Sequence, residues 1–162
     1  MKFIDQLKEK AKQNKKTIVL PETSDMRTIE AAGKVLAEGI ANIILVGDKE
    51  DIMSRAGDID LSGASFVDPK NYEKFDEYVD AFVEMRRKKG MTEARAKELL
   101  LTNPLYFGCM MVKQDDADGM VAGAINASAD VLRAALQTLK TAPGTRIVSA
   151  FFLVCLLYTS PS

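Results

Sequence analysis

Arginines and lysines are the residues of this sequence whose types and spacing could do chemistry, because they can bind an anion. Arg133 lies alone in the small-residue stretch VAGAINASADVLRAAL (residues 121–136), and Arg86 opens a run of cations, RRKK (residues 86–89). A guanidinium can donate two parallel hydrogen bonds to one phosphate or carboxylate group. Each arginine also has a structural explanation: Arg133 can pair with Asp130 at i, i+3, and cations at the end of a helix complement its dipole. The pattern alone favours these structural explanations.

The stretch around Arg133 predicts a strand that turns into a helix through a loop of small residues. Ser128 is placed to cap the helix, and Asn126 lies in the loop before it. A loop of this kind at the carboxyl end of a parallel strand leaves backbone N–H groups at the positive end of a helix, where anions bind. The sequence therefore predicts a corner in which these N–H groups are open to an anionic ligand.

Other polar or reactive residues have simpler explanations. After the first predicted strand, Asp25 can cap a helix, and Glu22 and Arg27 can form a local ion pair. The acidic stretch QDDAD (residues 114–118) could suggest a metal site, but no supporting ligands accompany it, so we predict a solvated loop. Cys109 lies in an apolar, Met-rich segment, which indicates a buried thiol rather than a nucleophile.

The composition excludes several classes of protein. A chain of 162 residues is long enough for one domain with a proper core. Its 22 Lys and Arg residues balance 23 Asp and Glu residues, so we expect no binding to nucleic acid or to a membrane. The sequence has no histidine, which excludes within this chain a Ser-His-Asp triad and a His-ligated metal. Two distant cysteines and the lack of a signal-peptide pattern indicate a reduced, cytoplasmic protein.

The elements that must position the candidate residues alternate between strand and helix. Strands are expected at residues 17–21, 41–47, 64–68, 118–123 and 147–153. Helices are expected at residues 3–11, 25–38, 49–55, 71–89, 92–101, 104–114 and 129–140. Within the segment 104–114, residues 107–112 could alternatively form a strand. The alternation predicts an α/β fold in which a parallel sheet carries helices on both faces, in three αβα layers.

Several stretches together resemble one family, the phosphate acetyltransferases. They are VLPETSDMRTIEAA, GIANIILVGD, EMRRKKGMTEARA, the block NPLYFGCMMVKQDDADGMVAGAINASADVLRAALQTLKTAPGT, and VSAFFL. They occur in the order and with the spacing of the family's N-terminal half, and the resemblance covers residues 17–153. The long block is specific, because it is not a generic α/β pattern.

The resemblance implies reversible transfer of an acetyl group between coenzyme A (CoA) and phosphate, by attack of the CoA thiolate on acetyl phosphate. It implies small-molecule partners (CoA, acetyl phosphate and phosphate), no tightly bound cofactor or metal, and a homodimer for the full-length protein. Carried over from the family, Arg133 is a catalytic residue that contacts substrate phosphate or CoA, and Arg86 binds a CoA phosphate. Asn126 and Ser128 line the same site.

The sequence also departs from the family pattern. Ala127 replaces one of two hydroxyl residues, and Ala134 replaces a common proline. The resemblance makes residues 1–153 the incomplete first lobe of a two-domain acyltransferase, and residues 154–162 a non-native tail. We therefore expect this chain alone to be inactive.

Three alternatives remain open. The first is a phosphate butyryltransferase or another acyl-phosphate acyltransferase, and the second is a non-catalytic module that binds CoA or a partner. The third, a nicotinamide-dependent dehydrogenase, is weakened because the sequence has no G-x-G-x-x-G fingerprint.

Overall fold

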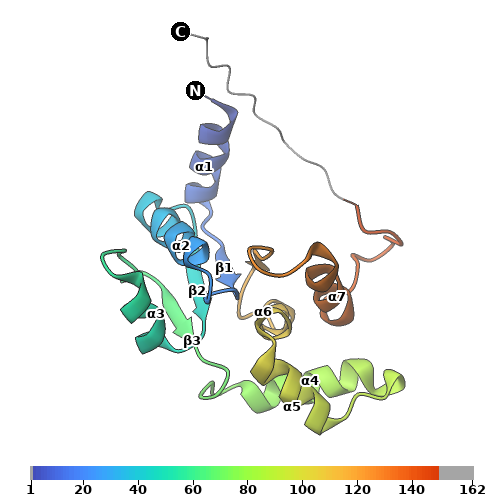
Figure 1. Ribbon diagram of the computed structural model, residues 1–162. Helices are drawn as coiled ribbons and strands as arrows, with labels where there is room; N and C mark the ends of the chain where they lie inside the picture. Colours follow the sequence, from blue (N-terminus) through green and yellow to red (C-terminus); the bar gives the residue numbers. More distant parts are fainter. Residues whose placement is uncertain (1, 150–162) are drawn as a thin grey trace.

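A four-stranded parallel sheet lies at the centre of the computed structural model, which describes residues 2–149 (Figure 1). The strands lie in the order β3-β2-β1-β4 and are β1 (Thr17–Leu20), β2 (Asn42–Val46), β3 (Ser65–Val67) and β4 (Gly119–Met120). Strand β4 joins β1 on the side opposite to β2, so the strand order reverses between β1 and β4. Open α/β sheets usually bind ligands at the carboxyl ends of the strands beside such a reversal.

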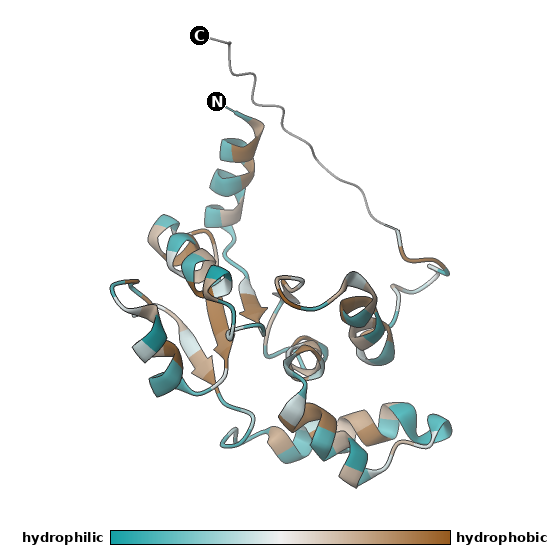
Figure 2. Ribbon diagram, in the orientation of Figure 1, coloured by the Kyte–Doolittle hydropathy of each residue, from teal (hydrophilic) through white to brown (hydrophobic). Residues whose placement is uncertain are grey.

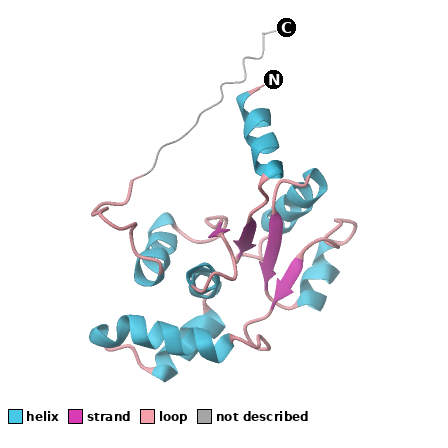
Figure 3. Cartoon of the chain, turned by 180° about the vertical axis from the view of Figure 1, so that it is seen from behind, coloured by secondary structure: helices cyan, strands magenta, loops and turns pink. Residues whose placement is uncertain are grey.

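One face of the sheet is covered by α2 (Met26–Glu38) and α3 (Lys49–Ala56), as Figure 3 shows from behind. The strand side chains that face these helices are Leu20, Ile43 and Leu45. Asp25 caps α2 by accepting a hydrogen bond from the Arg27 N–H (2.8 Å), and Gly39 ends it in the left-handed conformation. The predicted cap at Asp25 is therefore confirmed. Figure 2 shows how hydrophobic the two central strands are.

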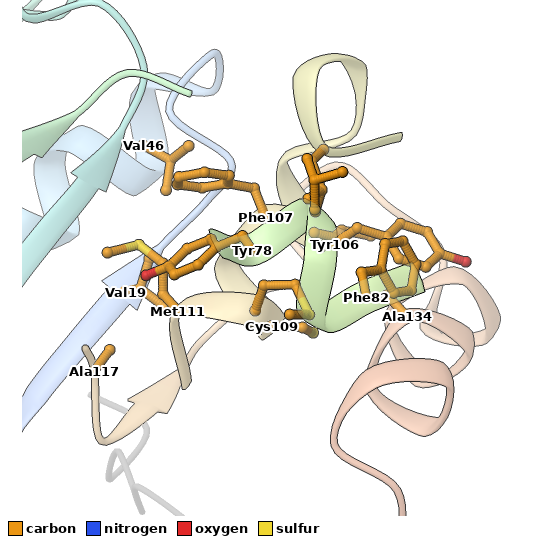
Figure 4. Packing of buried hydrophobic residues seen from close by; sticks show 14 of the residues in the cluster. Val19, Val46, Tyr78, Phe82, Tyr106, Phe107, Cys109, Met111, Ala117 and Ala134 are labelled. Carbon is orange, nitrogen blue, oxygen red and sulfur yellow. The ribbon is translucent and has the colours of Figure 1, made fainter. Parts of the chain in front are cut away.

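The other face carries a larger core built around α6 (Pro104–Lys113). Strand residues Val19, Ile44 and Val46 point into this core, and α6 buries Leu105–Met111 without interruption. In Figure 4, the fully buried Phe107 lies between β2 and the neighbouring helix α4 (Phe75–Arg86). Helices α5 (Glu93–Thr102) and α7 (Ser128–Thr138) complete this side. The predicted αβα arrangement is confirmed, and residues 107–112 are helix rather than strand.

The acidic stretch at residues 114–118 is part of the packing of this side. Asp116 accepts hydrogen bonds from Lys74 Nζ and from the Tyr78 hydroxyl. Asp118 accepts one from the backbone N–H of Thr17 (2.8 Å). Burial alone would raise the pKa of Asp116, but its two donors hold it below the usual value. The prediction of a solvated loop is therefore wrong for Asp116, which is largely buried, whereas Asp115 and Asp118 are exposed as predicted.

Helix α1 (Phe3–Gln13) extends away from both cores (Figure 1). It buries none of its residues, and its apolar side chains Phe3, Ile4 and Leu7 stay exposed. One ion pair, between Lys8 and Glu38 (2.8 Å), links it to the end of α2. Within residues 2–149, no helix combines the length and the apolar character that a membrane span requires.

Three predicted elements differ from the structure by more than two residues at one end or in kind. The helix expected at residues 71–89 begins at Phe75, after a turn, and ends in the 3-10 turn η1 (Arg87–Lys89). The strand expected at 118–123 shortens to two residues, because the N–H of Gly123 turns away to a carboxylate, Glu22. The strand expected at 147–153 is irregular over its first three residues. Its remainder and the predicted tail, 154–162, lie outside the described residues.

Candidate functional site

A cavity of about 580 Å³ opens between the end of α4 and helices α5, α6 and α7. It brings together Arg86, Asn126 and Arg133, three of the four residues that the sequence analysis selected. The rest of the lining consists of Lys89, Gly90, Met91, Arg95, Leu99, Asn103, Tyr106, Asp130 and Gln137. Four cationic side chains and one carboxylate thus line the cavity, and a cleft of this kind attracts polyanions.

The turn between α4 and α5 sets the position of two of the cations. Gly90 has a left-handed conformation (φ +80°), and its N–H donates to the carbonyl of Arg87 (3.0 Å). The next N–H, of Met91, returns to the carbonyl of Arg86 (3.2 Å). This pair of bonds closes the end of the helix in the way that a C-terminal glycine permits. Arg86 and Lys89 consequently line the cavity.

Arg87, in contrast, is not among the lining residues and pairs with Glu84 (2.6 Å) on an exposed surface. The cationic run therefore divides between two roles. All four cations lie at the C-terminal end of a helix, where they complement its dipole, and two of them, Arg86 and Lys89, also line the cavity.

Arg133 combines both of the roles that the sequence left open. Its Nη1 pairs with Asp130 Oδ1 at 2.7 Å, one turn earlier on α7, so the predicted i, i+3 ion pair is confirmed. Both side chains are about half exposed and both line the cavity. An exposed pair of this kind contributes roughly 0–1 kcal/mol to stability. The carboxylate therefore holds the guanidinium at the cavity without binding it tightly.

Tyr106 supplies an aromatic wall of the cavity. It is almost fully buried, its ring packs against Phe82 with centroids 5.8 Å apart, and its hydroxyl donates to Gln137 Oε1 (2.9 Å). Burial raises the pKa of the hydroxyl, although the positive charges of Arg133 and Arg86 act in the opposite direction. Tyr106 is therefore a neutral hydrogen-bonding group.

The sequence analysis did not select Tyr106, Gln137, Lys89 or Arg95 individually. The last two lie in the motif EMRRKKGMTEAR, which was the available signal. Tyr106 and Gln137 carry no local signal, because they meet only when α6 packs against α7.

The loop between β4 and α7 closes around an internal carboxylate, that of Glu22. The N–H groups of Gly123 and Ala124 donate to its Oε1, and those of Ile125 and Asn126 donate to its Oε2. Burial alone would raise the pKa of Glu22, but these backbone donors lower it to about 2. The prediction that the loop N–H groups are open to a ligand is therefore wrong at these four positions. The predicted ion pair of Glu22 is also wrong, because Arg27 pairs with Asp25 (2.7 Å).

Ser128 occupies the first turn of α7 and does not line the cavity. The residue in the cap position is Ala127, and no side chain caps this helix end. The predicted Ser128 cap is wrong because α7 begins one residue earlier than expected, at Ser128 itself.

The lining residues can bind an anion but include no cysteine or histidine. Cys109, on α6, is fully buried, and burial raises the pKa of its thiol, as expected for an inert packing residue. Within residues 2–149, no group of three or more potential ligand side chains could hold a metal ion. The cavity thus supplies positive charge and hydrogen-bond donors.

Comparison with known proteins identifies the family of this chain. The family described as phosphate acetyl/butaryl transferase matches residues 2–159, nearly the whole chain. The chain belongs to this family. The match reaches beyond residue 153 and so includes part of the segment that the sequence analysis treats as a tail.

Relatives in the phosphate acetyl/butaryl transferase family are similar over almost all of the chain. The phosphate acetyltransferase of Acetivibrio thermocellus is 51% identical over 154 residues, which are 95% of this chain and 46% of the relative. That of Thermoanaerobacterium thermosaccharolyticum is 52% identical over 154 residues, or 95% of this chain and 47% of the relative. The chain therefore spans about half the length of these curated relatives.

Solved structures confirm the α/β fold. A phosphotransacetylase from Streptococcus pyogenes has a TM-score of 0.82 and 36% identity, covering 91% of this chain and 46% of its own. The EutD phosphotransacetylase from Staphylococcus aureus has a TM-score of 0.79 and 38% identity, covering 89% of this chain and 44% of its own. The resemblance to phosphate acetyltransferases is confirmed, and the dehydrogenase alternative is set aside.

Proposed function

We propose that this chain is the anion-binding lobe of an enzyme that transfers an acetyl group between coenzyme A and phosphate. The observation that carries the proposal is the cavity lined by four cations, Arg86, Lys89, Arg95 and Arg133, and by a single carboxylate. Both substrates are anions, since CoA carries three phosphate groups and acetyl phosphate carries one. A cationic cleft raises the local concentration of such substrates and orients them.

The chemistry of the reaction calls for these cations. The CoA sulfur forms a bond to the acetyl carbonyl carbon, the bond from that carbon to the phosphate oxygen breaks, and phosphate leaves. Negative charge develops on the carbonyl oxygen during the attack, and donors aimed at it lower the barrier. We assign this role to Arg133 and the binding of a CoA phosphate to Arg86. Asn126, which lines the cavity, is a further proposed substrate contact. Ser128 does not line the cavity and is proposed as a contact on the family resemblance alone. CoA enters as a substrate rather than as a resident cofactor.

The same proposal covers the whole protein to which such a lobe belongs. Because the chain spans about half the length of its relatives, we expect it to bind CoA without appreciable turnover. We also propose a homodimer for the full-length protein and a cytoplasmic location. The description of the family covers two acyl groups, so butyryl transfer is the second candidate. Turnover of acetyl and butyryl phosphate, compared in a full-length version, distinguishes the two.

Calorimetric titration of the chain with CoA tests the proposal. Arg133→Ala removes a guanidinium from the cavity wall, and loss of a charge-assisted contact is expected to weaken binding by about ten-fold or more. Arg87→Ala is the matched control, because this arginine is exposed, paired with Glu84 and absent from the cavity lining. Binding in all variants is expected to weaken as salt is added.

Equal CoA affinity in the Arg133 and Arg87 variants contradicts the proposed site. No CoA binding by the unmodified chain contradicts the proposal that this lobe binds the substrate by itself. Formation of acetyl-CoA by the chain at a typical enzymatic rate, on the order of 10 per second, contradicts the expected lack of turnover.

A further inference from the structure

Glu22 lies at the point of the sheet where the strand order reverses, between the end of β1 and the loop after β4. Only 4% of the residue is exposed. Besides the four backbone N–H groups described above, the Asn126 side-chain Nδ2 donates to its Oε2 (2.9 Å). Five donors therefore converge on one carboxylate, at a place where sheets of this type commonly hold a ligand.

The same loop is held from its other side by Arg27. Its Nη2 donates to the carbonyl of Ala124 (2.6 Å) while the guanidinium also binds Asp25. Apolar packing contributes little to the loop, because Val121 and Ile125 are 62% and 54% exposed. The polar contacts, and above all those of Glu22, therefore determine where the loop lies.

The loop leads directly into the cavity wall. Asn126 belongs both to the set of donors around Glu22 and to the cavity lining. Helix α7 begins two residues later and presents Asp130, Arg133 and Gln137 to the cavity. A shift of the loop would move this entire wall relative to Arg86, which is carried by α4 on the opposite side.

We propose that Glu22 is a positioning residue: its carboxylate is a built-in anion that orders residues 123–126 and thereby places Asn126 and α7 around the anion-binding cavity. Glu22 itself does not line that cavity. The effect on substrate affinity rests on the proposed function, whereas the ordering of the loop does not.

Amide hydrogen exchange of the chain tests the ordering directly. In Glu22→Ala, we expect the amides of Gly123–Asn126 to exchange about ten-fold faster or more, because each loses its charged acceptor. The buried amides of α6 are expected to remain strongly protected, with a loss no larger than the fall in the free energy of unfolding accounts for. Formate, which supplies a small carboxylate, is expected to restore loop protection in Glu22→Ala. It should not do so in Glu22→Gln, where the side chain still fills the space. Glu30→Gln, an exposed glutamate on α2, is the matched control.

CoA titration of the same variants tests the consequence for the cavity. Glu22→Ala is expected to bind CoA about ten-fold more weakly, and formate is expected to recover most of this loss. Formate should not strengthen CoA binding by the unmodified chain.

Each other outcome has a definite meaning. Unchanged loop exchange in Glu22→Ala and Glu22→Gln overturns the proposal, as does a disordered loop with undiminished CoA affinity. Complete loss of α6 protection in both variants, without recovery in formate, also overturns it, since Glu22 would then support the whole fold. If the unmodified chain binds no CoA, the proposed function fails, and the exchange experiment still decides whether Glu22 orders the loop.

Discussion

The buried carboxylate of Glu22 predicts a pH-dependent contribution to folding stability. Its pKa falls from 4.5 in a free side chain to about 2 in the folded chain. At about 1.4 kcal/mol for each pKa unit, this difference corresponds to roughly 3 kcal/mol of stability from the ionised group. Because the folded-state pKa lies below the unfolded one, the contribution is present above about pH 4.5 and is lost as the pH falls towards 2.

Replacement of Glu22 by glutamine isolates this contribution. The variant keeps the shape of the side chain but cannot ionise, and its amide group turns two N–H donors towards a site made of donors. At neutral pH we expect the unmodified chain to exceed Glu22→Gln in free energy of unfolding by roughly 3 kcal/mol. The difference is expected to shrink steadily between about pH 4.5 and pH 2.

Urea unfolding followed by circular dichroism at a series of pH values measures the effect. Glu30→Gln, with the same chemical change on an exposed part of α2, is expected to differ from the unmodified chain by less than about 0.5 kcal/mol throughout. The reasoning is refuted by a difference for Glu22→Gln that stays constant as the pH is lowered. It is equally refuted by a difference at neutral pH no larger than that of the Glu30 control.

Two further predictions concern Gly90 in the cavity lining and Cys109 in the core. Gly90→Ala is expected to lower the free energy of unfolding by about 1 kcal/mol, because φ is +80° and the added Cβ meets no atom within 4 Å, so the cost is that of the backbone. Urea unfolding that shows equal or greater stability would contradict this. In a Cys155→Ser variant, the remaining thiol, Cys109, is expected to react with Ellman's reagent only after denaturation, since it is fully buried and burial raises its pKa. Rapid reaction of the native chain would show that α6 is more accessible than its packing indicates.

Local sequence signals predict most of the fold because several helix ends carry their own physical cause. Asp25 caps α2, Thr92 accepts the Arg95 N–H at the start of α5, and Asn103 does the same for Leu105 at the start of α6. Such caps satisfy helix-end donors through side chains a few residues away, so they can be predicted from short stretches. Gly39 and Gly90 end their helices for an equally local reason, a left-handed conformation that suits glycine.

For helix α6, the local sequence pattern does not distinguish a helix from a strand. Its seven successive buried residues have no polar face, because the sheet, α4, α5 and α7 surround it. A segment that is hydrophobic on all sides has no periodicity that separates a helix from a buried strand. The start signal at Asn103 and Pro104 favoured the helix, and the tertiary packing decided it.

Only part of the candidate site could be predicted, because local pattern identifies helices but not contacts between distant segments. Arg86 and Arg133 are on helices that the pattern identifies, and the family resemblance brought them together. The partner of the loop amides could not be found in this way, because Glu22 is 101–104 residues away in sequence from its donors. A buried carboxylate and a bound anion satisfy backbone N–H groups equally well, and only the folded chain distinguishes them.

The ion pair of Arg133 shows that a structural role and a binding role need not compete. An exposed pair contributes roughly 0–1 kcal/mol, so Asp130 restricts the guanidinium to one side of α7 at little energetic gain. A phosphate group that enters beside four cations offers bidentate hydrogen bonds and a larger charge than this carboxylate. Arg133 can then exchange its contact with Asp130 for a contact with the ligand, and its side chain is already on the correct side of the helix. In the sequence, the Asp130–Arg133 pair favoured a purely structural role for Arg133. In the folded chain, the same pair holds Arg133 in position to bind an anion.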